Sequence, residues 1–245
     1  MIALEPYLDR PVATPDPAVV QAIDSGPIAP EQALPLTNVD RLLDPAPLPA
    51  ETGWCWLPDG IAYVAVRTPM PDVTAAMVDW WFDWHPEEAI RYRIWHPLAH
   101  ESNRVERPAT PGAKRHWNTI HHPVEDVGTG MEKVRIAFFP PTQMGFSTDA
   151  LDDPSVATIV CGRVGDDVRR ITHSAMVHVW LNENGGTVLR SHFWMGAALP
   201  RLLAHRRVRQ ATIPKKLPQA LSHHCAEEYT NLAQLLPELY AAMNR

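Results

Sequence analysis

The chain has 245 residues, 45% of them hydrophobic, with a formal net charge of -6 at pH 7 and an isoelectric point near 6.0. This length can bury a full hydrophobic core, and the acidic balance, without basic runs interleaved with aromatics, argues against a nucleic-acid partner. No apolar run reaches the ~18 residues that would cross a membrane, and the N-terminus mixes charges instead of building a signal-peptide core. A globular, cytoplasmic protein is expected.

The three cysteines, Cys55, Cys161 and Cys225, are widely separated and form no CxxC pair. Neither a disulfide framework nor a thiolate zinc cluster is therefore predicted. Isolated buried thiols are the expected state.

The first part of the chain differs in composition from the rest, because ten of the 25 prolines fall within the first 50 residues. A short helix at residues 16–23, with Pro17 in its first turn, is the one helix predicted there. Residues 1–51 are predicted to form an N-terminal arm or small cap, and residues 52–245 the main domain.

The main domain is predicted to consist mostly of hairpin-linked strands. Two β-rich runs flank Pro58-Asp59-Gly60, a second hairpin turns at Asn184-Gly185-Gly186, and residues 72–84 have the pattern of an amphipathic helix. The predicted strands are residues 53–57, 61–67, 91–95, 117–127, 133–139, 156–164, 171–181 and 187–195, with a polar, proline-containing loop at about 101–115. A long terminal helix, interrupted near Pro237, ends the chain.

Consecutive hairpins predict an antiparallel sheet, and a single late helix with an apolar stripe can cover the inner face of that sheet. The predicted fold class is therefore α+β, with a curved antiparallel sheet wrapped around a long C-terminal helix.

The terminal helix carries two metal-binding residue types on its apolar stripe. The stripe repeats every three or four residues and consists of Leu217, Leu221, His224, Glu228, Leu232, Leu235 and Leu239. His224 and Glu228 lie one turn apart, about 6 Å along the axis, so both can bind one cation. Burying them without a partner would cost several kcal/mol, and a metal ion removes that cost.

Further ligand candidates lie in two other segments. His96 and His100 flank Pro97 where a predicted strand gives way to a loop. Either one of them binds the metal, or both are hydrogen-bonded histidines at the end of a strand. His121 and Glu125 share a predicted strand face, but strand positions four residues apart are separated by about 13 Å. Only one of these two can therefore reach the same ion. Two histidines with two carboxylates suit zinc with an open position for water.

Several segments in order resemble diacetylphloroglucinol hydrolase and phloretin hydrolase, from about residue 52 to the end. They are Trp80-Trp81-Phe82, Tyr92-Arg-Ile-Trp-His-Pro-Leu-Ala-His100 with Asn103, Val124-Glu125 followed by Gly128, Phe138-Phe139-Pro140, Arg190-Ser-His-Phe-Trp-Met-Gly196, and His224-Cys-Ala-Glu-Glu228 through Leu232.

The resemblance implies a Bet v 1-like helix-grip fold and a zinc-dependent hydrolase that cleaves the carbon–carbon bond between an acyl group and a polyphenol ring. The implied zinc ligands are His100, Glu125, His224 and Glu228. Tyr92 and Asn103 match positions that contact the phenolic substrate, and His178 and His192 fall in the segment that supplies pocket histidines. One of these two histidines, with Tyr92, would serve catalysis. The implied partner is a small acylated phenol, and a homodimer is a further expectation.

Two alternatives belong to other functional classes. A helix-grip cavity can simply carry a small aromatic ligand without catalysis, because a fold does not fix a function. Another mononuclear metal enzyme, such as a non-haem iron oxygenase, needs two histidines and one carboxylate.

Overall fold

The structure is a computed structural model that describes residues 3–109 and 112–244. Residues 110 and 111 of the predicted loop at 101–115 lie outside this described part. Among the helices that are described, none combines the length and apolarity that a bilayer crossing would require.

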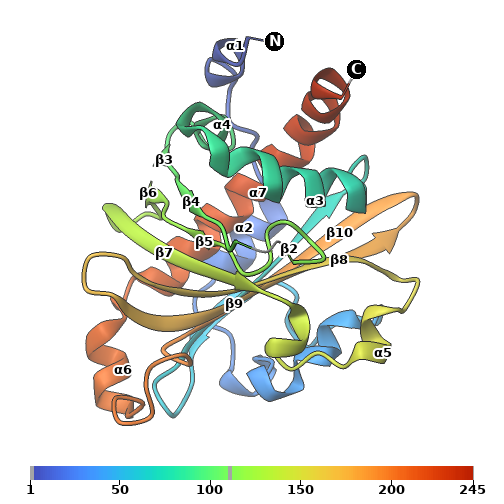
Figure 1. Ribbon diagram of the computed structural model, residues 1–245. Helices are drawn as coiled ribbons and strands as arrows, with labels where there is room; N and C mark the ends of the chain where they lie inside the picture. The colour runs from blue at the N-terminus through green and yellow to red at the C-terminus, as the bar shows by residue number, and fades with distance from the viewer. Residues whose placement is uncertain (1–2, 110–111, 245) are drawn as a thin grey trace.

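A single curved antiparallel sheet forms the body of the described chain (Figure 1). Its strands are Gly53–Trp56 (β1), Ala62–Met70 (β2), His100–Ser102 (β3), Val105–Glu106 (β4), Ile120–His121 (β5), Val124–Asp126 (β6), Met131–Phe139 (β7), Val156–Asp166 (β8), Ile171–Glu183 (β9) and Gly186–Met195 (β10). The strand order is β1-β2-β10-β9-β8-β7-β5-β4, and β6 pairs with both β3 and β7. The strands at 53–70 and 171–195 pair as the two predicted hairpins.

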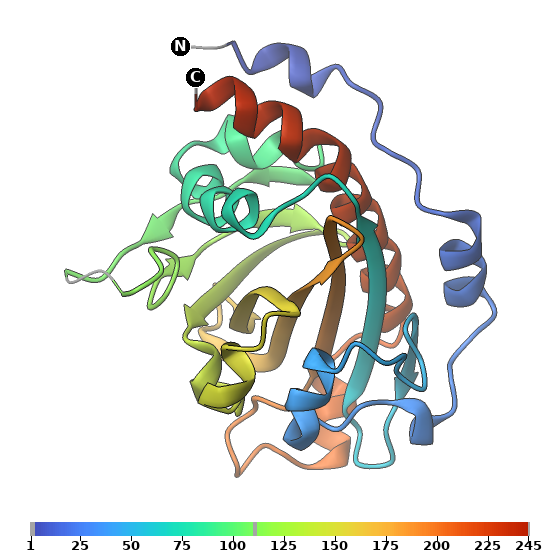
Figure 2. The same cartoon turned by 90° about the vertical axis from the view of Figure 1, so that its right-hand side faces the viewer.

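The described helices lie on both sides of this sheet. The α-helices are Glu5–Leu8 (α1), Pro17–Asp24 (α2), Ala75–Trp84 (α3), Ala89–Arg93 (α4), Thr148–Leu151 (α5), Arg206–Thr212 (α6) and Leu217–Met243 (α7), and the 3₁₀ helices are Pro30–Gln32 (η1), Leu36–Leu43 (η2), His85–Glu87 (η3) and Pro141–Gln143 (η4). Helix α7 lies in the concave side of the sheet, and the N-terminal segment runs along the outside of α7 (Figure 2). This is the predicted α+β helix-grip architecture.

Alternation along the strands separates two hydrophobic clusters. On β2, Val64 and Val66 point to the concave side and pack in the cluster that contains Leu232 of α7. Tyr63 and Ala65 point to the convex side, where the second cluster includes residues of the segment 33–48. Helix α7 therefore closes one face of the sheet, and part of the N-terminal segment covers the other.

Three predicted elements are corrected. Residues 91–95 are not a strand, because α4 and the turn after it occupy them; five residues are too few to distinguish a period of 2 from a period of 3.6. The strand predicted at 117–127 is split into β5 and β6 at His122-Pro123, since proline cannot donate to the strand ladder. Helix α7 continues without interruption through Pro237. With this split and the short strands β3 and β4, the described part of the chain forms a ten-stranded sheet.

Candidate metal centre and cavity

A cavity of about 820 Å³ lies between the concave face of the sheet and α7. Its wall is mostly apolar and includes Ile136, Phe138, Met176 and Phe193 from the strands and Leu221 from α7. This volume is within the range of small-molecule sites. The polar groups of the wall therefore decide what the cavity can bind.

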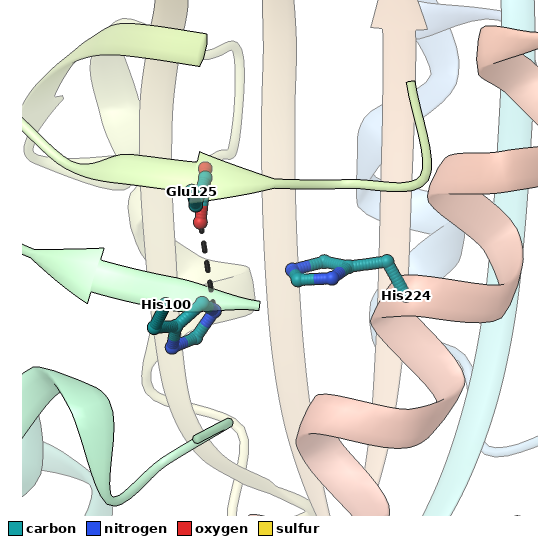
Figure 3. A group of neighbouring side chains, drawn as sticks. All are labelled: His100, Glu125 and His224. Carbon is teal, nitrogen blue, oxygen red and sulfur yellow. Dashed lines mark ion pairs between the residues drawn. The ribbon is translucent and has the colours of Figure 1, made fainter. Parts of the chain in front are cut away.

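Three side chains from distant segments converge beside this cavity; Glu125 and His224 line it, and the side chain of His100 next to them is fully buried. His100 is the first residue of β3, Glu125 lies in β6, and His224 lies in the second turn of α7 (Figure 3). Each offers one ligand atom, and these atoms all lie within 4.8 Å of one another. His100 and Glu125 are also direct cross-strand partners of the β3–β6 pair, which fixes their separation.

Glu228 lies beside this group, one helical turn after His224. Its Oε2 is 3.7 Å from His100 Nε2 and 3.8 Å from His224 Nε2. The side chains of His224 and Glu228 are 6% and 11% exposed, against 32% and 46% for His223 and Glu227. The stripe prediction that His224 and Glu228 face inward is confirmed.

Burial makes these four groups unfavourable as charged species when no cation is present. Desolvation raises the pKa of Glu125 to about 7, although the hydrogen bond from Tyr92 acts in the opposite direction. Desolvation and the nearby Glu125 raise the pKa of Glu228 well above its usual range. The pKa of His224 falls to about 3 and that of His100 falls well below 6.5, in both cases mainly through desolvation.

The donor set fits a divalent cation. A cation favours deprotonated carboxylates and neutral imidazoles, and the buried Nε2 of His100 has no hydrogen-bond partner among the described residues. His100 Nδ1 lies 3.2 Å from the Tyr92 carbonyl oxygen. Because a carbonyl can only accept, Nδ1 carries the hydrogen, and Nε2 offers its lone pair to the cluster. The three described cysteines are free and buried and do not belong to this group.

Tyr92 supports the cluster from α4. Its hydroxyl donates a short hydrogen bond to Glu125 Oε2, and its ring stacks on His100 with centroids 4.1 Å apart and an interplanar angle of 3°. Tyr92 therefore lines the cavity and orients two of the candidate ligands.

Asn103 and His178 also line the cavity, as the sequence prediction required. His178 Nδ1 lies 2.9 Å from Ser191 Oγ, and desolvation lowers the pKa of this histidine to about 3. Its imidazole is therefore neutral at pH 7.

His192 is the predicted site residue that the structure places elsewhere. It alternates with Phe193, which lines the cavity, so His192 points to the convex face. There its Nδ1 hydrogen-bonds to the Tyr63 hydroxyl at 2.8 Å, and its ring stacks on Trp194. The prediction of His192 as a pocket histidine is corrected, because the strand register turns it away from the cavity.

The structure places one member of each candidate pair in the cluster. His100 belongs to the cluster, whereas His96 Nε2 lies 3.3 Å from Glu227 Oε2. Glu125 belongs to the cluster, whereas His121 faces another part of the cavity, near His85. The cavity wall also includes His85, His173 and Tyr229, which are not among the predicted site residues. No spacing pattern in the sequence marks them, since each comes from a different element.

A curved antiparallel sheet around a helix, with a buried His/Glu cluster in the cavity between them, defines a helix-grip protein with a candidate metal site. The family model of the DAPG hydrolase PhiG domain matches residues 34–241, and the chain belongs to this family. The chain is 31% identical over 245 residues to phloretin hydrolase of Eubacterium ramulus, covering 96% of this chain and 88% of the relative. It is 30% identical over 242 residues to 2,4-diacetylphloroglucinol hydrolase of a Pseudomonas species, covering 91% and 82%.

Among solved structures, Ara h 8.0201 superposes with a TM-score of 0.44 at 11% identity, covering 73% of this chain and 99% of that one. Norcoclaurine synthase from Thalictrum flavum superposes with a TM-score of 0.38 at 11% identity, covering 73% and 89%.

Proposed function

We propose that the protein is a zinc-dependent hydrolase that cleaves the carbon–carbon bond between an acyl group and a phloroglucinol-type ring, a hydrolase of carbon–carbon bonds in ketonic substances. One observation carries the proposal: His100, Glu125 and His224 converge within 4.8 Å at an apolar cavity. The relatives are named as hydrolases of phloretin and 2,4-diacetylphloroglucinol, both acylated phenols.

His100, Glu125, His224 and Glu228 are the proposed zinc ligands. Two imidazole nitrogens and two carboxylate oxygens without a thiolate suit a catalytic zinc site. When bound, zinc supplies Lewis acidity, which polarises an oxygen or lowers the pKa of a water molecule. The two carboxylates balance the charge of the ion, and Tyr92 keeps Glu125 oriented through its hydrogen bond.

The reaction adds the hydrogen of water to the ring carbon and the hydroxyl to the acyl carbon, giving a free phenol and a carboxylic acid. An aryl carbanion is too basic to leave, so the acyl-bearing ring carbon is protonated first, and the ring becomes a ketone. Water then adds to the acyl carbon, and the carbon–carbon bond breaks with release of the ring as an enolate. The ring hydroxyls make both the ketone and the enolate accessible.

His178 is proposed to move the proton. Because its pKa is lowered to about 3, the imidazole begins neutral and cannot hold a spare proton at pH 7. It would take a proton from a phenolic hydroxyl and return it to the ring carbon, as a base followed by an acid. Tyr92 and Asn103, which line the cavity, are proposed to contact the phenolic substrate.

Metal analysis tests the ligand assignment. Purified protein is expected to contain about one zinc per chain, and His224→Ala and Glu228→Ala to lose both zinc and activity, since each removes a proposed ligand. His223→Ala is the matched control, because His223 points outward and hydrogen-bonds with Asp24. Wild-type zinc occupancy in both ligand variants would refute the assignment.

Chromatography tests the chemistry. The zinc-loaded protein is expected to release a carboxylic acid from acylated phloroglucinols, and chelation to abolish that release. A protein that binds these phenols equally well before and after chelation, with no product from a broad panel, would instead be a carrier.

A further inference from the structure

Two histidines of the cavity wall lie outside the metal cluster. His85 belongs to η3 and His121 to β5, and both line the cavity. Each is 2% exposed, and their ring centroids are 5.8 Å apart. The ring of His85 packs against Phe82, and the ring of His121 packs against Phe138. A hydrogen bond from either histidine to a ligand would therefore form in surroundings that exclude water.

Asn103 determines which nitrogen of His121 carries hydrogen. The backbone N–H of His122 donates to Asn103 Oδ1 at 3.1 Å, which identifies Nδ2 as the amide atom lying 3.4 Å from His121 Nδ1. An amide nitrogen can only donate, so His121 Nδ1 accepts and the hydrogen of the neutral ring is on Nε2. That Nε2 is buried and has no hydrogen-bond partner among the described residues.

His85 has the opposite arrangement. Its Nδ1 lies 2.7 Å from the carbonyl oxygen of Trp81. A carbonyl can only accept, so Nδ1 carries the hydrogen and Nε2 holds the lone pair. Within residues 3–109 and 112–244, no partner accepts or donates at this Nε2. Desolvation lowers the pKa of His85 to about 3 and that of His121 well below 6.5, so both rings are neutral.

Within the described chain, His121 Nε2–H is a free donor and His85 Nε2 is a free acceptor on the same cavity wall. Together they match a ligand group that both accepts and donates, such as a hydroxyl. We propose that His85 and His121 together bind one phenolic hydroxyl, with His121 Nε2–H donating to its oxygen and His85 Nε2 accepting its hydrogen. This inference rests on the proposed function, because it assigns the phenolic end of the same substrate. Besides its proposed contact with the substrate, Asn103 then holds His121 in the donating tautomer.

The position of this hydroxyl site relative to the metal cluster supports its use. The ring of Tyr92 stacks on His100 on the cluster side and on His85 at 5.9 Å. The hydroxyl site and the candidate metal site are thus separated by one aromatic side chain within one cavity. A phenol held by its hydroxyl at His85 and His121 can direct another oxygen toward the cluster.

Ligand pairs distinguish a hydroxyl site from a general effect on packing. The zinc-loaded protein is titrated calorimetrically with phloroglucinol and with 1,3,5-trimethylbenzene, whose methyl groups neither donate nor accept hydrogen bonds. His121→Leu is expected to raise the Kd of phloroglucinol about tenfold, the effect of one lost buried hydrogen bond, and to leave the Kd of the trimethyl compound unchanged. His121→Gln, which keeps an N–H donor, is expected to recover most of the loss.

His116→Leu is the matched control, because His116 is equally buried against Phe82 and Phe138 and is not part of the cavity wall. It should leave the Kd of both ligands unchanged. Equal losses for the two ligands in His121→Leu, or no loss for phloroglucinol, would overturn the hydroxyl site. ¹⁵N NMR of the wild type gives a second test, since hydrogen on His121 Nδ1 or on His85 Nε2 contradicts the proposed roles.

The same samples separate this inference from the proposed function. Zinc and acid release in the wild type, with an unchanged phloroglucinol Kd in His121→Leu, would remove the hydroxyl site and keep the hydrolase. A wild type without zinc or acid release that still shows the His121-dependent loss would remove the hydrolase and keep the hydroxyl site.

Discussion

His192 and Phe193 are neighbours on β10, and yet they belong to opposite faces of the sheet. Phe193 lines the cavity, whereas His192 is fully buried between Tyr63 and Trp194 on the convex side. Burial, followed by the charge of Arg190 and the neighbouring His178, lowers the pKa of His192 to about 3. His192 thus affects stability, and it has no access to the cavity.

This lowered pKa predicts a loss of stability in acid. An imidazole in the unfolded chain titrates near 6.5, so between pH 6.5 and about 3 the unfolded state binds a proton that the folded state does not. Each such histidine lowers the free energy of unfolding by up to about 1.4 kcal/mol per pH unit as the pH falls through that window, and has no effect above it.

His192→Asn tests this effect, because asparagine can keep a polar contact to Tyr63 but does not titrate. Urea unfolding between pH 7.5 and 4.5 should show a shallower pH dependence for this variant than for the wild type below pH 6.5. Parallel curves for the two proteins would contradict the assignment.

At the scale of elements, α7 brings the two inward-facing ligand candidates to the sheet and continues for 27 residues despite Pro237. A proline inside a helix removes the hydrogen bond to the carbonyl four residues earlier and crowds the preceding turn. The helix continues because its buried stripe, which includes Leu232, Leu235, Leu236 and Leu239, packs in the core. Tertiary packing therefore overrides a local helix breaker.

Pro237→Ala is expected to raise the free energy of unfolding by about 2 kcal/mol, because it restores the missing hydrogen bond at a small cost in unfolded-state entropy. Pro218→Ala is the matched control, since Pro218 lies in the first turn of α7, where no intrahelical bond is lost. Chemical denaturation measures both. A Pro237→Ala variant no more stable than the control would show that the helix accommodates its proline without cost.

At the scale of the whole molecule, Arg190 holds the N-terminal segment against the convex face of the sheet. Its buried guanidinium donates to the carbonyl oxygens of Leu42, Asp44 and Ala46 and to the carboxylate of Glu51. Hydrogen bonds from a charged group to several acceptors are stronger than neutral ones. The segment before β1 is thus joined to the body of the fold, although the division at residues 51 and 52 stays a prediction.

Arg190→Met is expected to lower the free energy of unfolding by about 3 kcal/mol, the usual cost of removing one partner of a buried ion pair, and to speed proteolytic cleavage near residues 42–51. Arg67→Met is the control, because the Arg67–Glu183 pair on the same sheet is partly exposed and such pairs contribute about 1 kcal/mol or less. Equal proteolysis of the two variants would contradict the anchoring role.

The elements with long patterns or distinctive turns could be predicted from residue order alone. They are both hairpins, helix α3 and the inward stripe of α7 with His224 and Glu228. The sequence also supplied the family, through motifs in a fixed order, and with the family the expected cluster of His100, Glu125, His224 and Glu228. Local periodicity carries this information because a side chain's face depends on the element to which it belongs.

The side chains that meet across the cavity could not be predicted in this way, because the three-dimensional fold brings them together. The fold places His100, and not His96, beside Glu125 through the β3–β6 pairing. It turns His192 to the convex face through the register of β10 and brings His85 to His121 from separate elements. These outcomes depend on strand register and on contacts between residues far apart in the chain, and a shift of one residue in register reverses every side chain of a strand. Sequence spacing contains no record of such contacts.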